Sequence, residues 1–436
     1  MDASVLDKLR ALVGPDHVLT GIGLSPFVVE GRTPEVAVFP GSIDEVRAVV
    51  ALAAEDSMPI TPWGGGTAAA VGTPVPWAGL VLGLTRLNRV IEHEPGDLTA
   101  TVEAGLTFAA LQNALRARGQ WLSLDPPDAD RATLGGVIAT NASGSRRHMY
   151  GTMRDLLIGV TIVTADGSVV HGGGKVVKNV AGYDLPKLFI GSHGTLGIIV
   201  EATLKLRPLP DEERFIAIAF DAPKDAGACV RAIMASDLIP IAMDVLDADA
   251  ARGLGLGGPA LIVGFDGLAE QVEWQSRELP RLASTFNGRD ARSLGVETIA
   301  RLGTAARDAF QQPAAVMRFS VLPTHVADTI EQGESAARGR GLVSAWAAHA
   351  GVGVVTGALA STGAQATGPV VAALDDWRGI ARANGGFATL DSAPLAVKAA
   401  VSVWDDAGAA GRVMKRIKAQ LDPKNILNPG RFVAGV

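Results

Sequence analysis

Residues 198–207 alternate between hydrophobic and polar side chains, which is the pattern of a β-strand with one buried face. Positions 198, 200, 202, 204 and 206 are apolar, and positions 201, 203, 205 and 207 are charged or hydroxyl-bearing. Pro208 and Pro210 follow, and proline lacks the N–H that a strand interior needs. We therefore predict a strand that ends at this pair of prolines.

Two other stretches carry apolar residues with a helical period. Residues 43–55 read IDEVRAVVALAAE and follow Ser42, which forms a capping box with Glu45. The stretch FAALQNALRAR follows Thr107 and is stopped by Gly119. Residues 1–13 form a third amphipathic pattern, which ends at a Gly-Pro pair. We predict a helix in each place.

Short apolar runs predict strands between these helices. They read MPITP before the glycines at 64–66, LVLGL at 80–84 and LTATVEA at 98–104. Asp166 and Gly167 separate two further runs and predict a tight hairpin turn. The first part of the chain is therefore built from helices and strands joined by glycine-rich loops.

The texture of the sequence changes after Pro210, where glycine loops give way to strand patterns such as RFIAIAFD and ALIVGFDG that alternate with helical ones. We expect residues 1–210 to form one domain and residues 211–400 a separate α+β lobe. Residues 401–436 contain an amphipathic helix that we expect to return to the first domain.

Residues 341–361 carry no charged side chain and are about as long as a membrane span. Their composition argues against a span, because they consist largely of glycine and alanine and carry His349 near the centre. We interpret them as a buried strand.

Composition excludes several classes of partner. The chain has 436 residues, 48% hydrophobic and 19% charged, with a net charge of -6, so it can bury a core and has no field that attracts nucleic acid. Its single cysteine, Cys229, excludes a disulfide framework and an iron–sulfur cluster held by this chain alone. The N-terminus lacks the pattern of a signal peptide, which favours a cytosolic location, with attachment to the inner membrane only through partner subunits.

The glycine-rich loops are the first candidates for chemistry. PWGGGT at 62–67 follows a strand, and its glycines let backbone N–H groups converge on a phosphate, although a plain tight turn explains this loop equally well. It matches neither the Walker pattern nor GxGxxG. Similar loops occur at 133–144, 150–155 and 191–197. Four of them suggest one long ligand, such as an extended dinucleotide.

Several motifs in order resemble the FAD-linked oxidases of the vanillyl-alcohol oxidase type. They include PWGGGT, ATLGGVIATNASG at 132–144, GYDLPKLFIGSHGTLGIIVEATLKLRPLP at 182–210 and DPKNILNPGRF at 422–432. Within that group the sequence is most similar to the branch of D-lactate dehydrogenases and of the FAD-binding E subunit of glycolate oxidase complexes. The resemblance covers residues 36–210 and 420–436 and is loose over the middle lobe.

This resemblance implies an α+β fold with a PCMH-type FAD-binding domain of two subdomains and an inserted α+β cap domain. It implies that the glycine loops hold FAD and that Asn428 approaches the flavin ring. The implied FAD contacts are Gly64, Gly65, Gly66, Thr67, Thr133, Gly135, Gly136, Ala139, Asn141, Ser143, Gly144, Gly194, Thr195, Gly197, Ile199 and Asn428.

Two departures from the family pattern refine this expectation. Some relatives attach FAD through a histidine in the first glycine loop, but this loop ends in Thr67, so we predict non-covalent FAD. Where the common pattern reads Gly-Ser-Glu-Gly, this chain has His193 in place of the glutamate. The backbone does most of the binding there, so the change is tolerable.

A third departure lies in the cap. Dehydrogenases of this branch carry a His-x-Gly-Asp-Gly-Asn-x-His stretch linked to a divalent metal and substrate. Here residues 349–356 read HAGVGVVT, so His349 and both glycines remain while the Asp, the Asn and the second His are absent. A divalent metal needs more than one good ligand, and we predict no metal at this place.

The eroded stretch is also similar to the E subunit branch, whose members work beside a second flavoprotein and an iron–sulfur subunit. The resemblance therefore implies such partners, because one cysteine cannot build an electron path inside this chain.

Oxidation of a 2-hydroxy acid asks for a cation that grips the carboxylate and a base that takes the hydroxyl proton. Arg318 suits the first role, because guanidinium binds carboxylate bidentately, although a solvent-exposed position is the alternative. His349 suits the second role, and a core histidine with a structural partner is its alternative. Lys178, Tyr183 and Asp184 are further candidates near the ring, and for Tyr183 and Asp184 a turn and a helix cap are equal alternatives.

Two functions stay open at this point. The chain is an FAD-dependent oxidoreductase acting on a small 2-hydroxy acid such as glycolate or D-lactate, as the FAD-binding subunit of a glycolate oxidase-type complex. Alternatively, it is a flavin-bearing relay or structural subunit with little turnover of its own, docked on a catalytic flavoprotein.

Overall fold

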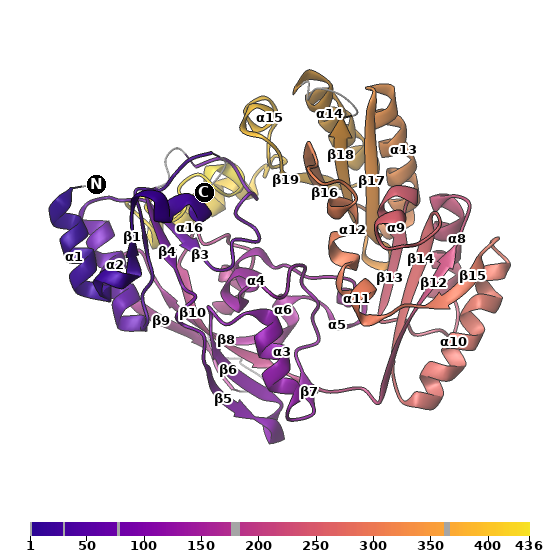
Figure 1. Ribbon diagram of the computed structural model, residues 1–436, viewed down its shortest axis with the longest axis horizontal. Coiled ribbons are helices and arrows are strands. Elements are labelled where there is room, and N and C mark those ends of the chain that lie inside the picture. The colour runs from indigo at the N-terminus through magenta and orange to yellow at the C-terminus, as the bar shows by residue number, and fades with distance from the viewer. Residues whose placement is uncertain (1, 29–30, 76–78, 176–183, 362–366) are drawn as a thin grey trace. The chain divides into compact units, whose positions relative to one another are not determined.

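The computed structural model describes residues 1–436 apart from 1, 29–30, 76–78, 176–183 and 362–366 (Figure 1). Two compact units divide the chain. Unit 1 comprises residues 1–142, 152–209 and 406–436, and unit 2 comprises residues 143–151 and 210–405. Both contain helices and sheets, so the expected α+β class is confirmed. Nothing in the sequence indicated that residues 143–151 leave the first unit.

The first sheet of unit 1 has the order β1-β2-β4-β3 among the described residues. Its strands are Val18–Leu19, Val36–Val38, Leu80–Gly83 and Ile60–Trp63. β2, β4 and β3 run parallel. Helix α2 (Ile43–Glu55) connects β2 to β3 and buries Val46, Val49 and Val50 in the same core as the strands. The sheet thus ends in the glycine loop that follows β3.

Helix α2 has the bounds that its sequence pattern predicts, but the capping box is displaced by one residue. Ser42 Oγ accepts a hydrogen bond from the Glu45 N–H at 3.2 Å, as expected. The Glu45 carboxylate accepts from the Gly41 N–H at 2.7 Å instead of from the Ser42 N–H. Glu45 also lies 3.5 Å from Arg86, which draws its side chain toward the preceding loop.

The second sheet of unit 1 is antiparallel, with the described strands in the order β5-β6-β10-β8-β9. They are Val90–Glu94, Thr99–Glu103, Ile198–Lys205, Leu157–Val163 and Val169–Gly173. The turn between β8 and β9 is the predicted Asp-Gly hairpin, with Gly167 at φ 80°. The strand before the proline pair is confirmed as β10, and Arg207–Pro208 continues as the short β11 against β7 (Gln120–Trp121).

Six further helices belong to unit 1 among the described residues. They are α1 (Ala3–Val13), α3 (Phe108–Arg116), α4 (Leu134–Thr140), α6 (Met153–Leu156), α7 (Pro186–Phe189) and α16 (Ala410–Leu421). Leu111 and Leu115 of α3 and Val137 and Ile138 of α4 pack in one core with strand residues such as Ala202. The predicted helices at the N-terminus and after Thr107 are confirmed.

Unit 2 is built on one antiparallel sheet, whose described strands have the order β15-β12-β14-β13-β17-β18-β16-β19. The strands are Glu212–Ala219 (β12), Ala242–Leu246 (β13), Ala260–Gly267 (β14), Arg289–Ser293 (β15), Ala315–Ser320 (β16), Leu342–His349 (β17), Val354–Ser361 (β18) and Phe387–Ser392 (β19). Its helices are α5 (Arg147–Tyr150), α8 (Pro223–Met234), α9 (Ala248–Gly253), α10 (Ala269–Ser284), α11 (Val296–Ala300), α12 (Ala305–Asp308), α13 (Val326–Gly339), α14 (Thr367–Ala383) and α15 (Leu395–Ala400).

The two faces of this sheet differ. One face carries Met243, Phe319, Trp346 and Val355, which pack in a single core with α8, α10, α13 and α14. Because side chains alternate along a strand, residues next to these point to the other face. That second face is covered by α9 and α12 over Ala242, Leu246 and Ala345, and it becomes partly exposed along β18, β16 and β19.

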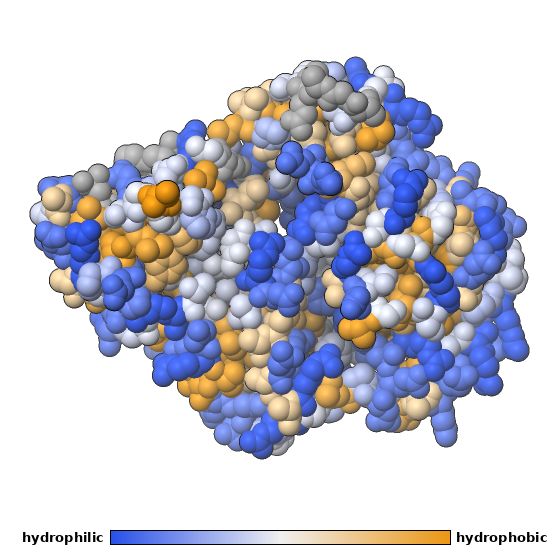
Figure 2. All heavy atoms as spheres, viewed as in Figure 1, coloured by the Kyte–Doolittle hydropathy of each residue, from blue (hydrophilic) through white to orange (hydrophobic). Residues whose placement is uncertain are grey.

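The uncharged stretch 341–361 forms two strands, not one. β17 and β18 pair along their whole length, and the turn between them includes Gly353 at φ 71°, which favours glycine. Among the described helices, none is both long and apolar enough to cross a membrane. On the visible surface of the unit 2 helices, hydrophobic and hydrophilic residues are interspersed (Figure 2).

Candidate functional site

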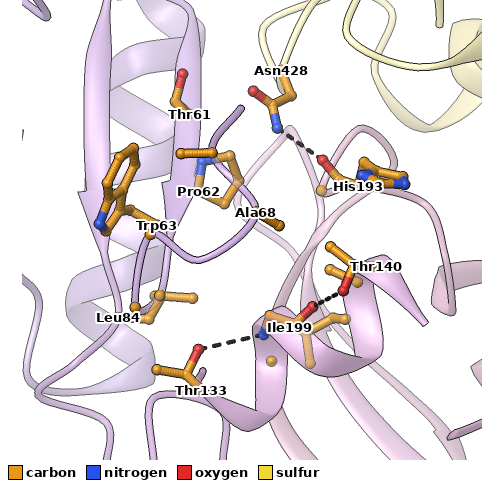
Figure 3. A pocket seen from close by; sticks show the side chains of 18 of the residues that line it. Thr61, Pro62, Trp63, Ala68, Leu84, Thr133, Thr140, His193, Ile199 and Asn428 are labelled. Atoms are coloured by element: carbon orange, nitrogen blue, oxygen red, sulfur yellow. Dashed lines mark hydrogen bonds between the residues drawn. The ribbon is translucent and has the colours of Figure 1, made fainter. Parts of the chain in front are cut away.

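A pocket in unit 1 is formed where the glycine loops after β3, before α4 and before β10 meet the C-terminal tail (Figure 3). Its empty space, counted out to the solvent at its mouth, is about 980 Å³. The lining residues are largely glycine, threonine and small apolar residues, so main-chain groups make up much of the wall. This composition suits a ligand held by backbone hydrogen bonds.

Two glycines of the first loop serve the packing of one loop on another. A Cβ on Gly65 would lie 1.7 Å from the carbonyl oxygen of Arg131, and one on Gly64 would lie 2.1 Å from Thr133 Oγ1. No side chain fits at either position. The sequence suggested that these glycines bring the backbone close to a phosphate. The structure adds a second role, because the absence of side chains lets the loop at 62–67 contact residues 131–133.

Gly136 is different, because a Cβ there would meet only Thr133 Oγ1, at 3.3 Å. It lies in α4, which begins where Thr133 Oγ1 accepts a hydrogen bond from the Gly136 N–H at 3.4 Å. Thr140 Oγ1 donates to the Gly136 carbonyl at 2.8 Å. The glycine therefore leaves open space on the pocket side of a short helix.

Lys418, which forms a buried ion pair within the C-terminal tail, also fixes the tail to the rest of unit 1. Lys418 Nζ donates to Asp422 at 2.6 Å and to the carbonyl oxygens of Thr195 and Leu427 at 2.7 Å each. The Asp422 carboxylate accepts from the N–H groups of Ile426 and Leu427. Burial lowers the pKa of Lys418, and Asp422 opposes that shift.

This clamp places Asn428 at the pocket. The Asn428 amide donates to the carbonyl oxygen of His193 at 2.8 Å, and Figure 3 shows the two residues facing each other. His193 has φ 52° and its ring stacks on Phe432 with centroids 5.2 Å apart. The sequence pointed to Asn428 but did not indicate that it binds the main chain of the fourth glycine loop.

Arg431 is a cation at the same pocket, and its residue is only 5% exposed. Its guanidinium donates to the carbonyl oxygens of Thr73 and Ala69. The residue therefore ties the tail to the segment that follows the first glycine loop. It was absent from the predicted contacts, although the motif NPGRF contains it.

The structure brings together most of the predicted cofactor contacts. Those that line the pocket are Gly64, Gly65, Gly66, Thr67, Thr133, Gly135, Gly136, Ala139, Gly194, Gly197, Ile199 and Asn428.

Four predicted contacts are not among the residues that line the pocket. Thr195 is fully buried, and its hydroxyl donates to the Ser192 carbonyl at 2.8 Å. Asn141 ends α4 with φ 50°, which makes it a helix-terminating residue. Ser143 and Gly144 belong to unit 2.

In unit 2, His349 pairs with a buried carboxylate. His349 on β17 is the direct cross-strand partner of Asp244 on β13, and its Nδ1 lies 2.5 Å from Asp244 Oδ1. The side chains are 16% and 3% exposed. His349 thus has a structural partner, as one of the two sequence alternatives required. Its side chain also remains partly exposed, which the other alternative, a role as a base, requires.

Arg318 on β16 also pairs with a carboxylate. Its Nη2 lies 3.2 Å from Asp391 Oδ1, but the groups are not aligned as a hydrogen bond. Burial raises the pKa of Asp391, while Arg318 and Lys398 lower it. The Arg318 side chain is 40% exposed, so one face of the guanidinium meets solvent.

The sheet register places these two candidates on one face. His349 pairs with Val354, and Val354 pairs with Ser320, which is two residues from Arg318. Side chains at even separations along a strand share a face, so Arg318 and His349 lie on the same side with β18 between them. Two inter-strand spacings separate their strands by roughly 10 Å.

Two of the remaining sequence candidates fall outside the described residues, namely Lys178 and Tyr183. Asp184 forms an ion pair with Lys187 at 2.9 Å. Among the described residues, no group of three His, Cys, Asp or Glu side chains is arranged to hold a metal ion.

Comparison with known protein families decides the identity of the fold. Residues 34–173 match the family described as FAD binding domain, and residues 209–432 match the FAD linked oxidases, C-terminal domain. The chain belongs to the FAD-linked oxidases. It is therefore an FAD-dependent oxidoreductase, as the motifs predicted.

Relatives of this FAD-linked oxidase span its whole length. It is 31% identical to the probable mitochondrial D-lactate dehydrogenase of Danio rerio, with 98% of this chain and 91% of the relative covered. It is 29% identical to the glycolate oxidase subunit GlcD of Bacillus subtilis, with 92% and 89% covered. The resemblance to the D-lactate dehydrogenase and glycolate oxidase branch is confirmed.

Solved structures agree on the fold. P-cresol methylhydroxylase with substrate bound superimposes with a TM-score of 0.80 at 18% identity, covering 99% of this chain and 96% of that one. Alkyldihydroxyacetonephosphate synthase has a TM-score of 0.76 at 20% identity, covering 99% and 86%. These likenesses confirm the expected PCMH-type architecture.

The pocket of this FAD-linked oxidase fits the cofactor. Its lining brings together glycines and threonines of three loops, which suit a phosphate-bearing ligand held by main-chain groups, and Arg431 adds positive charge. Gly136 leaves room on the inner wall where a larger residue would intrude. The residues that would hold FAD are therefore those of the three glycine loops, closed by the tail residues Asn428 and Arg431.

Sequence reasoning missed three groups near the candidate residues. Asp244 is the partner of His349, and Asp391 is the partner of Arg318. His148 lies near Asp244. All three are separated from their neighbours by long stretches of sequence, so no local pattern could have connected them.

Proposed function

We propose that the chain oxidises a small 2-hydroxy acid, such as glycolate or D-lactate, to the 2-oxo acid. The observation that carries this proposal is the sheet register of unit 2, which supports a cation and an imidazole on one face about two strands apart. In a small 2-hydroxy acid the carboxylate and the hydroxyl sit on neighbouring carbons, so the Arg318 and His349 side chains have to span the space over β18 to meet the two groups of one molecule. The names of the relatives point to the same substrate class.

Arg318 binds the substrate carboxylate in this proposal. Its side chain is 40% exposed and forms an ion pair with Asp391 that is not a hydrogen bond, which leaves N–H groups for a second carboxylate. A bidentate Arg–carboxylate contact fixes both position and orientation. Lys398, close enough to lower the pKa of Asp391, adds a second positive charge to this corner of the sheet.

His349 takes the proton of the substrate hydroxyl. Its Nδ1 is engaged by Asp244, which leaves Nε2 as the nitrogen that accepts a proton. The O–H bond breaks toward Nε2, and the carbonyl forms as the α-hydrogen departs with its electron pair. When bound, FAD supplies the two-electron acceptor for that hydrogen.

We also propose that this oxidase works as the FAD-binding subunit of a glycolate oxidase-type complex, with FAD held non-covalently and no metal in unit 2. A relative named as a glycolate oxidase subunit supports this assignment. The single cysteine supports an electron acceptor on another chain, because an iron–sulfur path needs several thiolates. In a cell, the complex would place the chain in the cytosol or at the inner membrane.

Anaerobic reduction tests the proposal. The full chain is purified, loaded with FAD and mixed with glycolate, D-lactate or L-lactate without oxygen. Bleaching of the flavin absorbance by one of the first two supports the proposal, and Arg318→Ala should slow it. A flavin that is reduced only after partner subunits are added supports the relay subunit instead. Flavin reduced by none of them under either condition overturns both.

Denaturation in acid provides the check on attachment. Non-covalent FAD is released into the supernatant when the chain precipitates. Flavin that stays with the precipitated chain overturns the non-covalent assignment.

A further inference from the structure

A buried carboxylate lies between two histidines in unit 2. Asp244 Oδ1 binds His349, whereas Asp244 Oδ2 is buried and has no hydrogen-bond partner among the described residues. His148 lies close enough to feel the charge of Asp244, and its Nδ1 is likewise buried without a partner there. Buried polar atoms without partners are rare and often mark function.

His148 reaches this place because its segment is anchored at both ends. Before it, Arg146 donates to both oxygens of Glu213 at 2.7 Å. After it, Tyr150 donates its hydroxyl proton to Asp266 at 2.6 Å. Residues 143–151 are thereby fixed to β12 and β14, and β14 pairs with β13, the strand that carries Asp244.

Gly351 gives His148 its space. A Cβ on Gly351 would lie 2.4 Å from His148 Nδ1 and 2.8 Å from the methyl group of Met243. This glycine follows His349 by two residues and belongs to the stretch HAGVGVVT. That stretch lacks three polar residues of the family pattern that it resembles. Its first glycine, Gly351, is nevertheless required, because a side chain there would collide with the His148 ring.

Of the two histidines near Asp244, only His349 forms a hydrogen bond with its carboxylate. Burial lowers the pKa of His148 and the charge of Asp244 opposes this, with burial the larger effect. A neutral His148 does not neutralise the carboxylate. The hydrogen-bonding and electrostatic influence of Asp244 is therefore directed to the imidazole that binds its Oδ1.

We propose that Asp244 is the positioning residue of the acid–base step. It holds His349 as the tautomer with the proton on Nδ1, so that Nε2 accepts the substrate proton, and it compensates the positive charge that the imidazole then gains. This inference rests on the proposed function, because it assigns His349 as the base. Its structural core, the tautomer of His349, does not depend on turnover.

The test combines a tautomer measurement with kinetics on the FAD-loaded full chain. Nitrogen NMR of labelled histidine distinguishes protonated from unprotonated ring nitrogens, and His349→Gln assigns the signal among the seven histidines. We expect His349 in the unsubstituted protein to carry its proton on Nδ1. We expect Asp244→Asn to shift it toward Nε2–H, because the amide N–H₂ donates where the carboxylate accepted. Finding Nε2–H in the unsubstituted protein overturns the proposal whatever the variants do.

Asp244→Asn should lower kcat roughly 100-fold or more and leave KM nearly unchanged. Asp247→Asn is the matched control, because Asp247 is an equally buried carboxyl next to the same strand that caps α9 by accepting from the Ala250 N–H. Equal losses in both variants, or no loss in Asp244→Asn, would overturn the positioning role. If the unsubstituted chain oxidises no 2-hydroxy acid, the proposed function is wrong. The NMR measurement of the His349 tautomer still tests whether Asp244 holds the proton on Nδ1.

Discussion

The α-carbon of Gly65 faces the carbonyl oxygen of Arg131 so closely that a Cβ would lie 1.7 Å from that oxygen. Two loops from different parts of unit 1 thus meet with no side chain between them. The pocket wall depends on this contact as much as on any contact with the cofactor.

Gly65→Ala should therefore lose both stability and FAD. The methyl group would have to displace backbone, and overpacking of this kind typically costs 1–3 kcal/mol or more. Thermal unfolding of the FAD-free protein checks the first effect and flavin content after purification the second. A Gly65→Ala protein with unchanged melting temperature would contradict the contact described here.

Gly136→Ala should separate binding from folding. Its methyl group meets only Thr133 Oγ1 within the chain, and alanine suits a helix better than glycine by roughly 1 kcal/mol, so the FAD-free protein should fold with little loss. FAD should bind about tenfold more weakly, because the methyl group occupies pocket space. Fluorescence titration with FAD measures this change.

Gly379→Ala is the matched control for that substitution. Gly379 is an exposed helical residue of α14, and a Cβ there meets nothing within 4 Å. It should leave FAD affinity unchanged. Equal affinities in both variants would remove Gly136 from the binding surface.

Arg318 and Asp391 should act on KM in opposite directions. Arg318→Ala removes the cation and should raise KM for the 2-hydroxy acid roughly 10- to 100-fold, as expected for a hydrogen bond between charged groups. Asp391→Asn removes the carboxylate that competes for Arg318, so KM should fall a few-fold. Steady-state kinetics with glycolate and D-lactate measure both. A rise of KM in Asp391→Asn would show that the carboxylate orients the arginine and does not compete with the substrate.

Lys418→Met should loosen the C-terminal tail. It leaves Asp422 buried without its ion-pair partner, and breaking such a pair typically costs 3–5 kcal/mol. Urea unfolding measures the loss, and the double variant Lys418→Met with Asp422→Leu should recover part of it. If the double variant is as unstable as the sum of the single ones, the two residues are not coupled.

Asp247→Asn should stabilise the protein at high pH. Burial raises the pKa of Asp247 to about 7, from an ordinary 3.8. The folded state therefore holds a proton that the unfolded state releases, and stability falls as pH rises through this window. Asparagine caps α9 without carrying charge, so the variant should gain up to roughly 4 kcal/mol at pH 8 and nothing at pH 3. Urea unfolding at pH 3 and pH 8 measures the free energy of unfolding of both proteins. An equal effect of the substitution at both pH values would contradict the raised pKa of Asp247.

Local patterns predicted local structure well. The bounds of α2 and the hairpin at Asp166 follow from periodicity and turn residues. Of the four glycine loops that we expected around one ligand, three line the pocket and the loop at 150–155 does not. The segment 341–361 was predicted as one strand, because an uncharged run of glycine and alanine hides the turn at Gly353. Periodicity cannot locate a turn that carries no polar residue.

The unpredicted parts of the candidate sites depend on long-range register. Asp244 meets His349 only because β13 pairs with β17, more than a hundred residues later. Likewise, Lys418 reaches the Thr195 carbonyl from the other end of the chain. The order of the strands and the position of the tail depend on the packing of whole elements. These contacts therefore cannot be predicted from single residues in the sequence.

The excursion of residues 143–151 into unit 2 limits how this protein can be recombined. An exchange of residues 210–405 for the corresponding part of a relative would keep the native Arg146, His148 and Tyr150 but replace Glu213, Asp244 and Asp266. A working chimaera must therefore carry two separate pieces of the donor chain.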